Sequence, residues 1–153
     1  MRTLDALITE SPVFKGLLPE QLDLIAGCGK NVVFESGARL FREGDPADTF
    51  FLVRHGIVGL DAYVPNRGQV TVETVGAGEI VGWSWFVSPY RWHFTGRAVE
   101  DVRAIEFDAA CLRTKCETDP ALGYDLVTRF SQVIVGRLQA TRLQLMDVYG
   151  NGG

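Results

Sequence analysis

The sequence has few of the residues that small enzymes and metal proteins use for chemistry. Its 153 residues include only two histidines, His55 and His93, which lie far apart along the chain. No HxH, HExxH, GxSxG or GxxxxGKS/T motif is present, so the patterns typical of zinc sites, serine hydrolases and phosphate-binding loops are missing. We therefore expect a protein that is not an enzyme and that requires no metal or other cofactor.

Cysteine is also scarce. Cys28, Cys111 and Cys116 cannot all pair within one chain, and no two of them form a CxxC motif. Three scattered cysteines do not supply the four thiolates of an iron–sulfur cluster. We expect all three to be free thiols.

Long apolar runs are missing as well. No run approaches the roughly 18 residues that a membrane-spanning helix needs. At the N-terminus, Asp5, Glu10 and Lys15 interrupt the apolar positions, so the stretch lacks the hydrophobic core of a signal peptide. We expect a cytoplasmic protein that makes no membrane contact.

Basic residues do not predominate. Lys and Arg number 15 and Asp and Glu number 19, which gives a formal net charge of −4. A protein that binds nucleic acid through its phosphates needs a basic face. The charge balance therefore argues against direct DNA binding.

Short β-type runs occupy the middle of the chain. β-Branched and aromatic residues recur in short runs separated by turn residues, of which the PNRG segment at 65–68 is the clearest hairpin turn. This spacing predicts a mainly β protein, an antiparallel β-roll or jelly roll flanked by helices. The expected strands lie within 31–35, 38–43, 49–54, 56–64, 69–75, 91–99 and 102–107.

Helical patterns flank the β region. We expect short helices within residues 1–29 and helices over 109–149, followed by a flexible tail at 150–153. The last helix carries an apolar stripe that is too long for a small roll to cover, which favours a homodimer through this helix; the alternative is a helix folded back along its own roll. The stripe consists of Leu122, Leu126, Phe130, Val133, Ile134, Leu138 and Leu145, with Thr141 in its one gap.

The segment at 76–98 is the best candidate for a binding site. Backbone N–H groups at a helical turn can bind a phosphate, Arg91 adds a planar charged donor, and Glu79 can accept from a sugar hydroxyl. Together these groups suit a phosphorylated sugar.

Three strings resemble the cyclic-nucleotide-binding domain found in catabolite-activator and Fnr-type bacterial regulators. They are FREGDPADTFFLVRHGIVGL at 41–60, GAGEIVG at 76–82 and RLQATR at 137–142. The resemblance implies a single domain over 1–153, with a roll at 30–108 and a phosphate-binding cassette at about 78–92.

The resemblance also implies roles for particular residues. Glu79, preceded by Gly78, matches the glutamate that binds the ribose 2′-hydroxyl, and Arg91 matches the arginine that pairs with the cyclic phosphate. Thr141 matches the threonine that contacts adenine. The implied ligand is cyclic AMP or cyclic GMP, and the implied binding set is Gly78, Glu79, Ile80, Arg91, Trp92, Thr141 and Arg142.

Several positions depart from the family pattern. The segment from Glu79 to Arg91 is longer than usual, bulky Trp92 and His93 replace small residues, and Arg142 stands where a serine is expected. Arg97 is an alternative phosphate contact. The aromatic residues of the segment are interpreted mainly as packing groups, with purine stacking, filling of the pocket or a partner surface as alternatives; they are Trp83, Trp85, Phe86, Tyr90, Trp92 and Phe94.

Two functional hypotheses follow. The first is a stand-alone sensor that binds a cyclic nucleotide and signals through its long helix to a dimer mate or an effector protein. The second is a nucleotide-free roll that serves as a dimerising interaction module, or that senses another small ligand. In the related regulators a helix-turn-helix domain follows the long helix, whereas only GNGG follows Tyr149 here, which again predicts no direct DNA contact.

Overall fold

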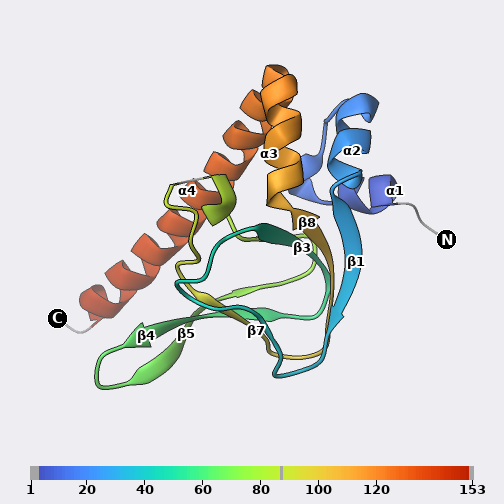
Figure 1. Ribbon diagram of the computed structural model, residues 1–153. Helices are drawn as coiled ribbons and strands as arrows, with labels where there is room; N and C mark the ends of the chain where they lie inside the picture. Colours follow the sequence, from blue (N-terminus) through green and yellow to red (C-terminus); the bar gives the residue numbers. More distant parts are fainter. Residues whose placement is uncertain (1–3, 87, 152–153) are drawn as a thin grey trace.

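Two antiparallel four-stranded sheets form a β-roll, and all the helices pack on one side of it (Figure 1). The computed structural model describes residues 4–86 and 88–151. One sheet has the order β1-β8-β3-β6 and the other β2-β7-β4-β5. This architecture confirms the predicted roll. The strands are β1 (Gly29–Phe34), β2 (Arg39–Phe41), β3 (Thr49–His55), β4 (Val58–Val64), β5 (Gly68–Val75), β6 (Ile80–Val81), β7 (Thr95–Ala98) and β8 (Val102–Asp108).

The helices cover the outer face of the first sheet. They are α1 (Leu4–Thr9), a 3-10 turn at Pro12–Phe14, α2 (Pro19–Ala26), α3 (Ala109–Thr118) and α4 (Pro120–Asn151), with a further 3-10 turn at Ser84–Phe86. The long helix α4 runs diagonally past the roll, as Figure 1 shows. It continues through Gly150 to Asn151, beyond the end expected from the sequence, and positions 152–153 of the expected tail lie outside the described residues.

Strand β3 separates two apolar cores. Because neighbouring side chains on a strand point to opposite faces, Phe50 and Phe51 enter different clusters. Phe50 packs toward the helices, where its ring lies 5.1 Å from that of Phe130 on α4. Phe51 points into the roll and stacks against Phe41 at 6.2 Å. A single strand thus joins the interior of the roll to the helical layer.

The hairpin between β4 and β5 forms where the PNRG turn predicts it. Asn66 and Gly68 adopt positive φ values of 72° and 76°, which asparagine and glycine tolerate better than other residues. Pairing runs from Val64↔Gly68 back to Val58↔Val75. β5 therefore forms an edge of its sheet.

The sequence predicts one continuous strand over 91–99, but in the structure only the second half of this run is a strand, β7. Tyr90 has a positive φ of 58°, and Arg91 pairs only through an isolated bridge to Pro46. Regular pairing starts at Thr95, opposite Asp61 of β4. The segment from Tyr90 to Phe94 therefore lies outside the regular strand β7.

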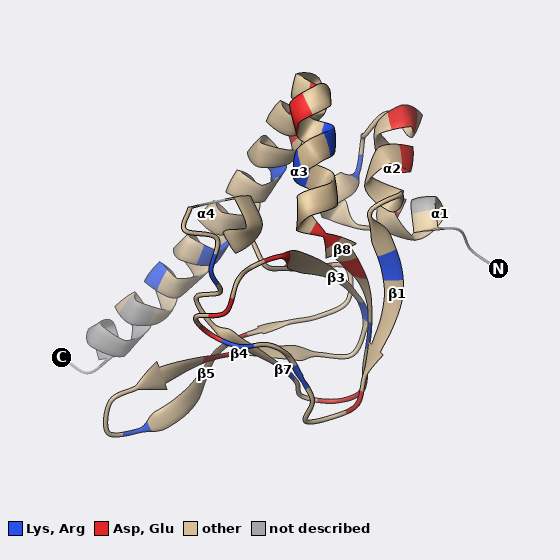
Figure 2. Ribbon diagram, viewed as in Figure 1, with Lys and Arg blue, Asp and Glu red and all other residues tan. Residues whose placement is uncertain are grey.

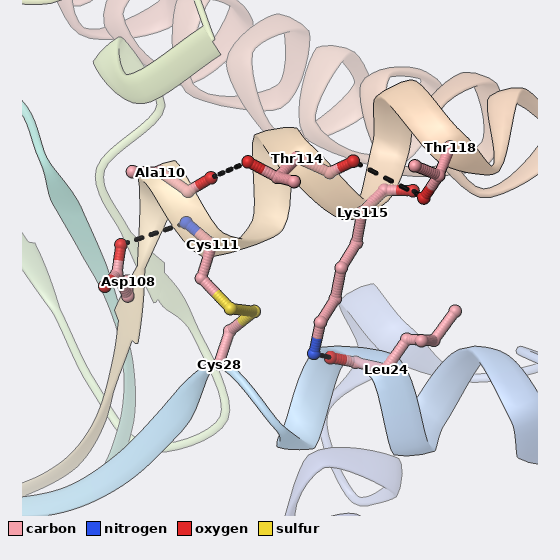
Figure 3. The surroundings of a disulfide bond; sticks show 8 residues. All are labelled: Leu24, Cys28, Asp108, Ala110, Cys111, Thr114, Lys115 and Thr118. Carbon is pink, nitrogen blue, oxygen red and sulfur yellow. Dashed lines mark hydrogen bonds between the residues drawn. A yellow bond between two sulfur atoms is a disulfide. The ribbon is translucent and has the colours of Figure 1, made fainter.

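The expectation of three free thiols is wrong. Cys28, just before β1, and Cys111, in the first turn of α3, form a disulfide with their Cα atoms 5.8 Å apart (Figure 3). Cys116 is free. Lys115 adds a second tie between the same segments, because its Nζ donates to the Leu24 carbonyl at 2.7 Å. The cysteines lie 83 positions apart, so only the fold brings them together.

The apolar stripe of helix α4 is buried in the first half of the helix and exposed in the second. Leu122, Leu126 and Phe130 are at most 1% exposed, whereas Leu138 is 66% exposed. The reason is geometric: the helical layer and the sheet cover only the start of the helix. Of the predicted stripe, the side chain of Leu145 lies outside the described residues.

Charged residues are spread over the fold rather than gathered. Figure 2 shows acidic residues on α2, α3 and the loops, and basic residues on α3, α4, β1 and the β4–β5 hairpin, with no single basic face in this view. Within residues 4–86 and 88–151, no helix has both the length and the apolar character required to span a bilayer.

Candidate functional site

A cavity of about 280 Å³ lies between the roll and α4. Because α4 supplies one wall, and strands β2, β4 and β5 with segments 82–84 and 92–94 supply the others, a molecule in this cavity would touch helix and roll at once. The lining residues are Phe41, Leu60, Glu73, Gly82, Trp83, Ser84, Trp92, His93 and Phe94 of the roll, and Ile134, Arg137, Leu138 and Thr141 of α4.

Aromatic rings form most of the roll side of the cavity. Trp92 is 6% exposed and stacks on Phe41 with ring centroids 3.6 Å apart. Trp83 lies nearly parallel to Phe94 at 6.4 Å. Flat aromatic walls suit a flat ligand, because rings stack favourably in offset arrangements. The aromatic segment therefore serves both packing and the cavity.

Other aromatic residues of the segment lie elsewhere. Trp85 is 3% exposed and packs in the helix-side core, with its ring 5.3 Å from Phe130. Tyr90 is 44% exposed, and the Arg113 guanidinium lies 5.3 Å from the centre of its ring. These two residues do not line the cavity described above.

Gly82 gives Trp92 its place in the wall. Its φ is +103°, and a Cβ at this position would lie 2.7 Å from the Trp92 Cη2 atom. We expect Gly82→Ala to lower the free energy of unfolding by roughly 2–3 kcal/mol, through backbone strain and displacement of the indole. Urea denaturation measures this change.

Gly136 on α4 is the matched control for that substitution. A Cβ added to Gly136 meets nothing within 4 Å, and helix propensity favours alanine over glycine by up to about 1 kcal/mol. Gly136→Ala should therefore leave stability unchanged or raise it. An equal loss in both variants would contradict the role given to Gly82.

Two polar side chains interrupt the apolar wall. The Ser84 hydroxyl and the His93 Nδ1 atom are 3.0 Å apart, and Ser84 is only 3% exposed. Such a pair can hydrogen-bond a polar edge of a ligand. On the helix side, the Thr141 hydroxyl donates to the Arg137 carbonyl at 3.0 Å.

Arg137 supplies a positive charge to the lining of the cavity. Among the described lining residues it is the only Lys or Arg. Its Nε lies 3.3 Å from Glu73 Oε1, and one Nη atom donates to the Ile80 carbonyl. Burial lowers the pKa of Arg137, while the nearby Glu73 and Glu79 carboxylates act in the opposite direction. The helix is thus tied to β5 and to the start of the cassette through one guanidinium.

Gly78, Glu79 and Ile80 lie on the other side of Arg137, in a separate groove beside α4. The Glu79 carboxylate accepts from the Gly76 N–H at 3.0 Å, and the Gly78 N–H donates to the Val53 carbonyl at 2.8 Å. Ile80 is 1% exposed. The sequence treats these residues as one site with Arg91, but the structure does not bring them together with it.

The two arginines considered as phosphate contacts are engaged elsewhere. Arg91 is exposed, and its Nη1 donates to the Gly44 carbonyl at 2.9 Å. Arg97 pairs with Asp61, with Nε and Oδ2 3.1 Å apart. Neither arginine lines the cavity.

Of the predicted binding residues, Trp92 and Thr141 do line the cavity. Arg142 is exposed and lies outside that lining. The sequence interpretation missed Glu73 and Arg137. A signal existed for Arg137, because it precedes Thr141 by one helical turn and therefore shares its face. No such signal marked Glu73, because a carboxylate on a strand of alternating polar and apolar residues usually points into solvent.

The protein is thus an antiparallel roll with a partly open cavity that one long helix bounds on one side. The sequence profile of the cyclic nucleotide-binding domain matches residues 31–119, and the chain belongs to this family.

Relatives of known sequence and structure agree with the assignment. The CRP-like cAMP-activated global transcriptional regulator of Mycobacterium tuberculosis is 22% identical over 145 residues, which are 95% of this chain and 63% of the regulator. The chain thus spans less than two thirds of that relative. A Geobacter metallireducens GS-15 structure assigned to the cyclic nucleotide-binding proteins has a TM-score of 0.80 and 30% identity, over 90% of this chain and 99% of that one. A cyclic nucleotide-binding domain from Methylobacillus flagellatus KT shares the fold, with a TM-score of 0.81 at 20% identity over 95% of this chain and 82% of that one.

Proposed function

We propose that this chain is a regulatory sensor that binds a cyclic mononucleotide, cyclic AMP first, in the cavity between the roll and α4. The observation that carries the proposal is the shared wall: roll and helix both line the cavity, so occupancy can be read out as a change in the position of α4. The cAMP-activated relative supports the choice of nucleotide. We propose Trp92 and Thr141, of the predicted set, as ligand contacts.

Calorimetry with cyclic AMP and cyclic GMP tests this proposal. We expect heat on binding, and a loss of about three- to tenfold in affinity for Thr141→Ala, the cost of one hydrogen bond. Arg91→Ala separates two locations for the phosphate: the outward position of Arg91 predicts unchanged affinity, whereas a cassette contact predicts its loss. No heat and no thermal stabilisation at millimolar nucleotide would contradict the proposal.

We further propose that the output passes through protein contacts of α4. Its second half exposes Val135, Leu138, Leu143 and Met146, each more than half exposed. A second copy of this helix, or an effector protein, would bury them, and the net charge of −4 does not favour DNA as the partner. We place this non-enzymatic module in the cytoplasm.

The homodimer has its own test. Leu143 is 63% exposed, so its replacement by glutamate leaves the described core intact while adding a charge to the proposed seam. We expect light scattering to give a dimer mass for the native chain and a monomer mass for Leu143→Glu. A monomeric native chain would contradict the dimer and leave the effector protein as the partner.

The aromatic rings that fill the roll side of the cavity favour a second candidate function. Trp92 fills the roll interior against Phe41, as expected of a nucleotide-free roll that acts as a dimerising module or takes another small ligand. This alternative predicts a stable dimer whose thermal midpoint ignores both nucleotides.

A further inference from the structure

The ion pair between Glu73 and Arg137 neutralises the cation of the proposed binding site. Arg137 is the only Lys or Arg among the described residues that line the cavity, and a carboxylate already occupies it. A ligand that carries a phosphate would meet a neutralised cation, with the Glu79 charge acting on the same guanidinium. Arg137 can offer an anion its full, uncompensated charge only when the Glu73 carboxylate has moved away.

The two partners differ in their freedom to move. The Glu73 side chain is 34% exposed, whereas that of Arg137 is 18% exposed. Glu73 lies on β5, the edge strand, where its carboxylate can rotate into water. Arg137 is also held by the Ile80 carbonyl and sits on a helix. The carboxylate is therefore the partner that can leave.

We propose that Glu73 is an internal competitor for the ligand's anionic group: it neutralises Arg137 in the empty site, and a cyclic nucleotide binds by displacing it. This inference rests on the proposed function. It assigns the phosphate-binding cation to α4 rather than to Arg91 or Arg97.

The exchange also couples binding to the helix. In the empty state Glu73 ties α4 to β5, and in the bound state the ligand replaces that tie. Because the guanidinium is a planar fork with five N–H donors, it can hold a phosphate and keep the Ile80 carbonyl. Binding therefore replaces the Glu73 contact of Arg137 by a contact to the ligand, while the bond to the Ile80 carbonyl still holds α4 to the roll.

The test compares cyclic AMP with adenosine on the full chain by calorimetry. Adenosine keeps the purine and the ribose but lacks the phosphate. Glu73→Gln should bind cyclic AMP about tenfold more tightly than the native chain, with adenosine unchanged, a coupling within the usual range between interacting sites. Arg137→Gln should weaken cyclic AMP about tenfold or more and abolish the gain of Glu73→Gln in the double variant.

Asp61→Asn is the matched control. It breaks the Arg97–Asp61 pair in the same sheet, so it also replaces a paired carboxylate by an amide. We expect no gain in cyclic AMP affinity from it. An equal gain would overturn the assignment to Arg137. If Arg137→Gln does not fold, Arg137→Lys keeps the charge, and the Glu73→Gln comparison remains decisive because Glu73 is partly exposed.

The outcomes separate this inference from the proposed function. If the native chain binds cyclic AMP and neither Glu73→Gln nor Arg137→Gln changes its affinity by more than twofold, the competitor role is overturned and the sensor function stands. If neither the native chain nor Glu73→Gln binds cyclic AMP or cyclic GMP, the proposed function is overturned and the inference with it.

Discussion

Replacing Phe130 with alanine should lower the free energy of unfolding by about 4 kcal/mol, within the range for deletion of a fully buried aromatic ring. Phe130 is 0% exposed and, with Leu122 and Leu126, packs α4 into the helix-side core. Its ring lies 5.1 Å from Phe50, 5.3 Å from Trp85 and 5.7 Å from Phe86. Alanine would leave a cavity among these rings and loosen the helix. Chemical denaturation followed by tryptophan fluorescence measures the loss.

Tyr124 gives a matched control on the same helix. It is also aromatic, but its side chain is 78% exposed, and its backbone carbonyl bond to Thr128 does not depend on the ring. Tyr124→Ala should change stability by about 0.5 kcal/mol or less. If Phe130→Ala cost no more than Tyr124→Ala, α4 would not be docked as the structure shows.

Reducing the Cys28–Cys111 disulfide should lower the free energy of unfolding by about 2–4 kcal/mol. The two cysteines are 83 positions apart, and a cross-link over a long loop removes much conformational freedom from the unfolded chain. For a domain of this length, we expect the melting temperature to fall by about 5–15 °C in excess dithiothreitol. Differential scanning calorimetry with and without the reductant measures the shift.

Cys116 supplies the control for that experiment. Burial raises the pKa of the Cys116 thiol, and the Asp119 charge adds to this, so little of the nucleophilic thiolate forms. Cys116→Ser should leave the response to reductant intact, whereas Cys111→Ser should abolish it. Equal melting temperatures of the oxidised and reduced chains, with the thiols counted by mass spectrometry, would show that the disulfide contributes nothing to stability. Disulfides are uncommon in the cytoplasm, so a thiol count on protein from cells also bears on the proposed location.

Local signals predicted most of the fold. The β4–β5 hairpin follows from Asn66 and Gly68, whose preference for positive φ is a property of those residues alone. The strands follow from alternation, as Phe50 and Phe51 illustrate by pointing to opposite faces. Non-local pairings were out of reach: nothing near Cys28 indicates that Cys111 is its partner.

The candidate site was harder to predict from the sequence, because it depends on where side chains point and on which elements are neighbours in the fold. The spacing of Arg91 from Glu79 suggested one site, but in the structure Arg91 donates to the Gly44 carbonyl and does not line the cavity. Thr141 was found through the resemblance to the family, because it matches the threonine that contacts adenine. Glu73 and Arg137 meet only because β5 and α4 are neighbours in the fold, which one-dimensional spacing does not encode.

The contacts that hold α4 to the rest of the protein lie in the part of the helix up to Arg137, so a small tilt there produces a large displacement of its C-terminal end. The helix is held near its start by Phe130, and by Arg129, which donates to the carbonyls of Val13 and Lys15. Among the residues that the structure describes, Arg137 makes the last ion pair between α4 and the roll along the helix. From there to Asn151 the helix extends 14 residues, or about 21 Å. A tilt of about 10° at Arg137 would carry its end through about 4 Å, so a shift too small to disturb the core would be large at the far end.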